Sequence, residues 1–276
     1  MQDAITAVLL GIVEGLTEYI PVSSTGHMIL VGDWVGFTGV RAGVFEVFIQ
    51  LGAILSVLLI YKDTFLRMFT RYDCLYLYKR KNWFRRDTGL TLAHIVVGIV
   101  PVMIIGLLAH HAIKTYLFSA GTVIIGLIVG GIFMLVAEKL HVHTVCRDVE
   151  QMTIGQAFFV GLFQVFALWP GFSRSGSTLA GGLLLGVSRK AAADFSFIIA
   201  VPVMLAACFF DLYKNWSLLS SDDILMIAIG FIVAFGVAYV SVLWFLRFLH
   251  KSTLASFAYY RFFIALISWV YFFLLH

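Results

Sequence analysis

Residues 14–27, EGLTEYIPVSSTGH, place two carboxylates, a proline, small hydroxyl residues and a histidine inside an otherwise apolar stretch. Glu14 and Glu18 are four residues apart and share one face of a helix. Two carboxylates at that spacing repel each other unless a proton or a cation lies between them. A hard divalent cation such as Mg²⁺ binds carboxylate oxygens and often completes its shell with substrate phosphate. The pair is therefore a candidate metal site, and a pair held by hydrogen bonds from neighbouring helices is the alternative.

The segment after this pair has the pattern of a broken helix whose second half begins at an anion site. Pro21 ends the first helix, and the SSTG that follows is typical of a helix start, where free N–H groups and the helix dipole attract anions. A second stretch, PGFSRSGST at 170–178, repeats the pattern and adds Arg174, whose guanidinium suits a phosphate. Helix capping alone is the alternative for the hydroxyl residues. The candidate phosphate-binding residues are Ser23, Thr25, Gly26, Ser173, Arg174, Ser175 and Thr178.

Two further side chains could do chemistry beside such a phosphate. Ser24 is a candidate nucleophile, and His27, three residues later, is predicted to face the same cavity as an acid or base. A hydrogen-bonded structural histidine is the alternative for His27. With a carboxylate pair for a cation and an arginine for phosphate, these are the parts of phosphoryl transfer. Because the site lies in a membrane-embedded segment, the predicted substrate is a lipid phosphate.

The composition indicates an integral membrane protein of the α-helical kind. The chain has 276 residues, of which 61% are hydrophobic and 12% charged, about half of the roughly 25% charged residues typical of soluble domains. Ionisable residues at membrane depth are costly and are functional candidates by default. The sequence assigns no role to two of them, Glu46 and Asp194. The residues predicted at that depth are Glu14, Glu18, Glu46, Arg174 and Asp194.

The predicted architecture has six transmembrane helices and two re-entrant helix–loop–helix hairpins in one domain, 1–276. A stretch of about 20 apolar residues can cross the hydrocarbon core as a helix. The hairpins are predicted at 3–40 and 153–187, which are apolar at both ends but rich in Gly, Ser and Pro between them. The six predicted spans are 43–61, 91–111, 118–138, 191–212, 223–246 and 255–275.

The two hairpin segments match each other at an offset of 150 residues. Ser23 falls on Ser173 and Glu14 falls on Gln164, and several glycines coincide. Each half, 1–140 and 151–276, then holds one hairpin followed by three spans. Because three is odd, the second half enters from the opposite side, which predicts an inverted repeat whose two tips meet near the midplane.

The distribution of basic residues predicts the orientation. The segment 62–89 is strongly basic and is therefore predicted to be a cytoplasmic loop that also touches anionic lipid. Alternation of the spans places fourteen Lys and Arg residues inside and three outside. The net charge of +4 thus reflects topology, and no nucleic-acid partner is expected. The first hairpin begins and ends on the outer face, so its polar centre is predicted to be open to the outside.

Four motifs together resemble the bacterial undecaprenyl-diphosphatase family, which is also known for bacitracin resistance. They are EGLTE (14–18), PVSSTGH (21–27), FEVFIQLG (45–52) and PGFSRSGST (170–178), and the similarity runs over the whole chain. The resemblance implies hydrolysis of undecaprenyl diphosphate, which recycles the carrier lipid of peptidoglycan synthesis. It also implies a divalent cation, Mg²⁺ or Ca²⁺, and a bacterial cytoplasmic (inner) membrane location with the site facing the periplasm or exterior.

The resemblance also implies residue roles. Glu14 and Glu18 match the acidic pair for cation binding and catalysis, Ser24 the nucleophile, His27 the essential histidine and Arg174 the diphosphate-binding arginine. Whether Ser24 attacks directly or a metal-bound water does so stays open. The competing function is a transporter or flippase of a lipid phosphate, since inverted repeats with broken helices are common in carriers. The expected partners are a polyprenyl diphosphate and membrane lipids, and a homodimer is left open.

Overall fold

The chain is all-helical, and six of its helices are long and apolar enough to cross a membrane. The computed structural model describes residues 2–70, 83–86, 89–117, 119–140, 143–215, 223–249 and 251–275. A helix pairs its own backbone groups, which is why apolar stretches of this length can lie in lipid. The prediction of six spans in a polytopic membrane protein is confirmed. The six helices are α3 (Val40–Ile60), α5 (Leu92–Tyr116), α6 (Ala120–Lys139), α9 (Arg189–Asn215), α10 (Ile224–Leu249) and α11 (Ala255–Val270), the last continued by η7 (Tyr271–Leu275).

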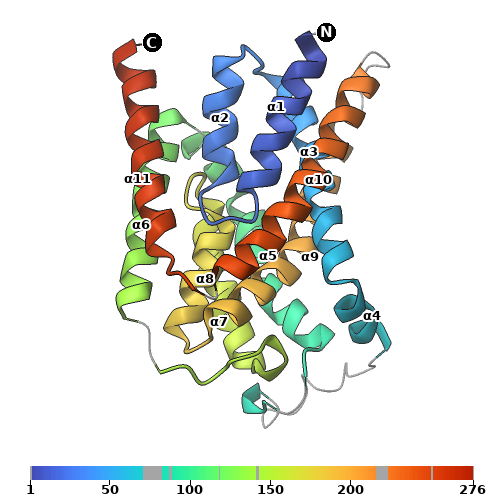
Figure 1. Cartoon of the computed structure of the whole chain (residues 1–276), viewed down its shortest axis with the longest axis vertical. Helices are drawn as coiled ribbons and strands as arrows, with labels where there is room; N and C mark the ends of the chain where they lie inside the picture. Colours follow the sequence, from blue (N-terminus) through green and yellow to red (C-terminus); the bar gives the residue numbers. More distant parts are fainter. Residues whose placement is uncertain are drawn as a thin grey trace.

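Two pairs of shorter helices lie between these spans, where the sequence predicts hairpins. The first pair is α1 (Gln2–Thr17) and α2 (Ser24–Trp34); the second is α7 (Ile154–Gln164) and α8 (Arg174–Leu184), with η4 (Val165–Leu168) in its turn. Figure 1 shows α1 starting at the edge that carries both termini, turning near mid-height, and α2 returning to the same edge. The α7–α8 pair occupies the opposite half of the molecule (Figure 1). The two turns therefore approach each other in the middle.

Glycines let α1 and α7 approach the spans that support them. A Cβ on Gly11 would lie 2.8 Å from the Gly230 carbonyl oxygen of α10, and a Cβ on Gly161 would collide with the backbone of Gly98 in α5. Small residues at such crossings allow close backbone packing, which drives helix association in lipid. Gly11 and Gly161 are 150 positions apart, so the two broken helices are anchored at corresponding points.

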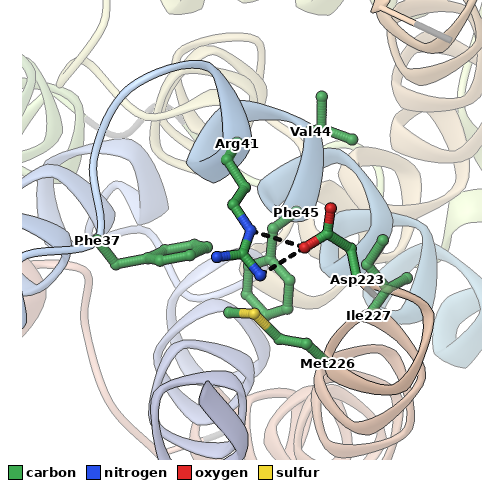
Figure 2. A pocket seen from close by; sticks show the side chains of 7 residues that line it. All are labelled: Phe37, Arg41, Val44, Phe45, Asp223, Met226 and Ile227. Carbon is green, nitrogen blue, oxygen red and sulfur yellow. Dashed lines mark hydrogen bonds and ion pairs between the residues drawn. The ribbon is translucent and has the colours of Figure 1, made fainter. Parts of the chain in front are cut away.

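Polar contacts join the helices at both edges of the bundle. At the edge with the termini, Arg41 at the start of α3 pairs with Asp223 just before α10, at 2.5 Å from Nη2 to Oδ1 (Figure 2). Phe37 and Met226 lie beside this pair (Figure 2). At the opposite edge, Arg189 pairs with Glu138, which also accepts a hydrogen bond from the backbone N–H of Leu254 at 3.1 Å. These contacts hold α3 to α10 and α6 to α9 and α11.

The predicted basic loop, 62–89, begins as a helix. Residues Lys62–Thr70 form α4, which carries Met68 buried against the core. This segment lies at the edge opposite the two termini (Figure 1). Residues 71–82, 87 and 88 of the predicted loop lie outside the described part of the chain.

Candidate functional site

A polar cavity of about 150 Å³ lies where the two turns meet. It is reached by the N-termini of α2 and α8, whose first N–H groups have no intrahelical acceptors. Two helix dipoles therefore direct their positive ends at one cavity, an arrangement that favours a bound anion. The polar residues that line it are Glu18, Ser23, Ser24, Thr25, Gln50, Trp169, Ser173 and Arg174.

Glu18, Ser24 and Arg174 are in direct contact across the cavity. The Ser24 hydroxyl donates to Glu18 Oε2 at 2.5 Å, and Arg174 Nη2 donates to Glu18 Oε1 at 3.3 Å. A second donor, Arg174 Nη1, holds the carbonyl of Ser196 in α9 at 3.2 Å. The structure thus joins a hydroxyl, a carboxylate and a guanidinium from both turns, which is the geometry of a hydroxyl nucleophile beside a base and a phosphate-binding cation.

Tyr19 supports this arginine, although the sequence reasoning did not select it. The Arg174 guanidinium lies over the Tyr19 ring at 5.4 Å from its centroid, and the ring is packed edge-on against Phe197. The Tyr19 hydroxyl is buried and has no hydrogen-bond partner among the described residues. The ring face, and not the hydroxyl, is therefore the part of Tyr19 that acts on Arg174.

This contact gives a prediction for paired variants. We expect Tyr19→Phe to retain phosphate release and Tyr19→Leu to reduce it about tenfold, because a buried cation–π contact contributes roughly 1–2 kcal/mol. The measurement is the turnover rate of both variants at a saturating concentration of polyprenyl diphosphate, the substrate that the sequence predicts. Equal rates for the two variants would show that the aromatic face contributes nothing.

The caps of α2 and α8 are strained in the same way. Ser23 has φ 72° and Ser173 has φ 76°, and within the described chain these are the non-glycine residues with positive φ. Each side chain caps its helix, accepting from Gly26 N at 3.5 Å and from Gly176 N at 3.2 Å. Left-handed backbone at a non-glycine residue costs about 1–3 kcal/mol and collects at functional sites. The backbone geometry of each cap places the serine side chain and the N–H groups that follow it at the cavity.

The strained caps allow a stability test. We expect Ser173→Ala to be about 1 kcal/mol less stable than Ser173→Gly, since alanine loses the cap and keeps the strain whereas glycine tolerates positive φ. Thermal unfolding in detergent, compared with the same pair at position 23, measures the difference. An alanine variant more stable than the glycine variant would contradict the strained geometry.

His27 does not line the cavity, contrary to the expectation that it shares it with Ser24. Its Nδ1 lies 2.8 Å from the carbonyl oxygen of Ser23, and its Nε2 lies 2.9 Å from the hydroxyl of Tyr260 in α11. The two rings are also stacked, with centroids 5.6 Å apart. His27 thus ties the α2 start to α11, which matches the structural alternative. Its role in catalysis remains a prediction.

Three predicted phosphate-binding residues also lie off the cavity. Thr178 hydrogen-bonds to the Arg174 carbonyl at 2.9 Å and to Ser196 Oγ at 2.6 Å. Ser175 hydrogen-bonds to the Ile20 carbonyl at 3.3 Å, which links the two turns. Gly26 is packed against Leu127. In this geometry these residues position the site, and the part that each takes in phosphate binding is left to experiment.

Glu14 is buried one helical turn from Glu18. Its carboxyl group interacts electrostatically with Glu18, Glu46 and Arg174. Within the described residues no three His, Cys, Asp or Glu side chains form a metal cluster. Two carboxylates still fit Mg²⁺, which usually keeps several waters and takes substrate phosphate as ligands. Asp194 accepts a hydrogen bond from the Tyr61 hydroxyl at 2.6 Å, away from the cavity.

Arg261 was missing from the residues predicted at membrane depth. It lies in α11, is fully buried, and donates to the carbonyls of Leu127 at 3.2 Å, Gly126 at 3.1 Å and Gly171 at 2.8 Å. It therefore fastens the α7–α8 turn to α6. An arginine inside a predicted span is itself a signal that could have identified it. Gln50, within a quoted motif, and Trp169 beside PGFSRSGST were likewise not selected from the sequence, although both line the cavity.

Comparison with known proteins gives one consistent result. The family model for the bacitracin resistance protein BacA matches residues 7–267. The chain is 47% identical over 271 residues to undecaprenyl-diphosphatase 1 of Bacillus anthracis, covering 98% of this chain and 99% of that protein. It is equally similar to undecaprenyl-diphosphatase 1 of Bacillus thuringiensis subsp. konkukian, and 46% identical over 267 residues to that of Bacillus cereus, with 97% of each chain covered.

Proposed function

Because the chain belongs to the bacitracin resistance protein BacA family, we propose that it hydrolyses undecaprenyl diphosphate to undecaprenyl phosphate and inorganic phosphate. This activity recycles the lipid carrier of cell-wall synthesis and confers bacitracin resistance. The observation that carries the proposal is the 2.5 Å contact between the Ser24 hydroxyl and Glu18, beside Arg174. A protein that only bound or moved a lipid phosphate would not need a nucleophile already paired with a base.

In the proposed reaction, Ser24 Oγ attacks the terminal phosphorus while its proton passes to Glu18. The bond from that phosphorus to the bridging oxygen breaks, and undecaprenyl phosphate leaves. Glu18 gives up this proton with the departing undecaprenyl phosphate. Water then attacks the phosphoserine, Glu18 accepts the proton of the water and returns it to the departing Ser24 Oγ, and inorganic phosphate is released. Arg174 and the N–H groups at the two helix starts stabilise the charge on the phosphoryl oxygens. His27 would act through the position of the α2 start or after a rearrangement of its hydrogen bonds.

Glu14 and Glu18 are the residues that would hold a divalent cation, Mg²⁺ or Ca²⁺. The cation would neutralise phosphate charge and relieve the repulsion within the carboxylate pair. Arg174 would direct its donors to the phosphate of the substrate.

We further propose that α1–α2 and α7–α8 are re-entrant hairpins of an inverted repeat in the bacterial inner membrane. Supporting this are the matching strained caps at Ser23 and Ser173 and the position of each pair in its own half of the molecule (Figure 1). The strongly basic segment 62–89 supports a cytoplasmic position for the edge opposite the termini. The α1–α2 pair then opens the site to the periplasm or exterior. Every residue used comes from one chain, so the proposal does not depend on a homodimer.

The test is phosphate release from undecaprenyl diphosphate by detergent-purified protein, with Mg²⁺ and with EDTA. We expect cation-dependent release that Glu18→Gln nearly abolishes. Asp63→Asn, an exposed carboxylate in α4, is the matched control and should leave release unchanged. No release with any cation, from protein that still binds the lipid, would overturn the proposal and favour a lipid-phosphate carrier.

A further inference from the structure

The helices α5 and α9 separate on one side of the polar cavity. They are in contact near Gly98, where a Cβ would lie 3.1 Å from the Phe195 ring and 3.5 Å from Ile199. Each helix then contains a proline, Pro101 in α5 and Pro202 in α9. A proline inside a helix removes one backbone hydrogen bond and favours a bend. Both prolines thus stand at the point from which the two helices part.

An apolar groove of about 270 Å³ lies between α5 and α9, on the C-terminal side of these prolines. Its walls come from Val102 to His110 of α5 and from Val203 to Phe210 of α9, with Leu168 of η4 between them. Gly106 and Ala207 contribute no bulky side chain to the walls. By contrast, α3 and α10 pack along each other over much of their length.

The groove and the polar cavity adjoin along two walls. At the end of η4, Ala167 and the following Trp169 line the cavity, while Leu168 between them lines the groove. In α9, Met204 lines the cavity while its neighbour Val203 lines the groove. The two spaces therefore lie on either side of the η4 segment and of the same turn of α9, and the flexible Met204 side chain can adapt to a passing chain.

We propose that the α5–α9 groove binds the first isoprene units of the substrate, next to the diphosphate. This inference rests on the proposed function. A diphosphate in the polar cavity must send its hydrocarbon chain out through an apolar wall, and this groove lies directly on the other side of the wall that η4 and α9 form. It holds only a short stretch of chain, so the remainder lies in the bilayer.

A larger apolar groove, of about 550 Å³ beside Val240, Trp244 and Tyr260, is the competing route. The α1–α2 turn stands between this groove and the cavity. Tyr260 on its wall is bound to His27, which in turn contacts the Ser23 carbonyl oxygen. A chain leaving by that side would have to break this hydrogen-bonded connection, whereas the α5–α9 side has none to break among the lining residues.

The test compares Ala207→Trp, which fills the α5–α9 groove, with Val240→Trp, which fills the larger one. Both positions are exposed, so each indole can be accommodated without entering the core. We expect Ala207→Trp to raise KM for undecaprenyl diphosphate about tenfold, while release from the five-carbon isopentenyl diphosphate is unchanged. Val240→Trp should change neither the KM for undecaprenyl diphosphate nor the release of phosphate from isopentenyl diphosphate. A raised KM for undecaprenyl diphosphate in Val240→Trp, with the KM of Ala207→Trp unchanged, would overturn the inference.

A measurement on the unaltered chain removes any dependence on variant folding. A prenyl diphosphate with a photoreactive group in its first isoprene unit is expected to label residues between Val203 and Phe210. Labelling between Val240 and Trp244 instead would contradict the groove assignment. A wild-type protein that releases phosphate from neither substrate would refute the hydrolase itself, so the two failures are distinguishable.

Discussion

Arg174→Lys is expected to lower phosphate release from undecaprenyl diphosphate at least about 10²-fold, although it keeps the positive charge. The guanidinium of Arg174 reaches Glu18 with Nη2 and the Ser196 carbonyl with Nη1, so its plane is held across the cavity. The three donors of lysine come from one nitrogen, so they do not reach both the Ser196 carbonyl and the phosphate as the two separate Nη groups of arginine do. The loss should appear mainly in kcat, because the added charge on the phosphoryl oxygens develops during transfer.

The measurement is steady-state phosphate release over a range of substrate concentrations, with Mg²⁺ present. Arg247→Lys, at an exposed position near the end of α10, is the matched control and should retain wild-type rates. A wild-type kcat in the Arg174→Lys variant would show that one positive charge is sufficient and that the two separate guanidinium donors are not needed. An effect confined to KM would assign Arg174 to substrate capture alone.

Arg261→Met is expected to destabilise the protein by at least about 3 kcal/mol and to abolish phosphate release. Hydrogen bonds to charged groups contribute roughly 1.5–3 kcal/mol each, and Arg261 donates three to carbonyls. The 2.8 Å bond to Gly171 matters most for activity, because it holds the turn that carries Ser173 and Arg174. Methionine fills much of the same space, so the loss reflects the missing donors more than a cavity.

Thermal unfolding and phosphate release in detergent, measured on the same preparations, test this prediction. Arg261→Lys keeps one donor group and should be intermediate in both properties, which a simple packing role would not produce. An Arg261→Met protein with wild-type Tm and activity would show that the α7–α8 turn holds its position without the arginine.

The distribution of polar residues explains why one serine can be reactive while its neighbours are structural. Ser175 and Thr178 lie on the α8 faces that meet the Ile20 carbonyl and α9. Their hydroxyls are therefore already hydrogen-bonded to neighbouring segments. Ser24 lies at the first position of α2 and faces the cavity with Glu18. A hydroxyl at the first position of a helix has no preceding carbonyl of that helix to bond back to, whereas one a turn later has such a carbonyl.

The sequence by itself determined the membrane class, the six spans and the two helix–turn–helix segments. Apolar length decides what can cross lipid, and Pro21 and Pro170 with their flanking Ser and Gly residues decide where a helix must break and restart. For the same reason the sequence placed Ser23, Ser24 and Arg174 at helix starts. The family motifs pointed to the same residues before any of their contacts were known.

Only the tertiary structure decided which of these polar side chains meet. Arg174 contacts Glu18 across 156 positions of sequence, and His27 turns to Tyr260 across 233 positions. The periodicity of a helix says which residues share a face, but not which neighbour that face is turned toward. That choice depends on how all the helices pack together, here through the glycine crossings and through Arg261. The polar cavity and its apolar groove exist only once that packing is complete.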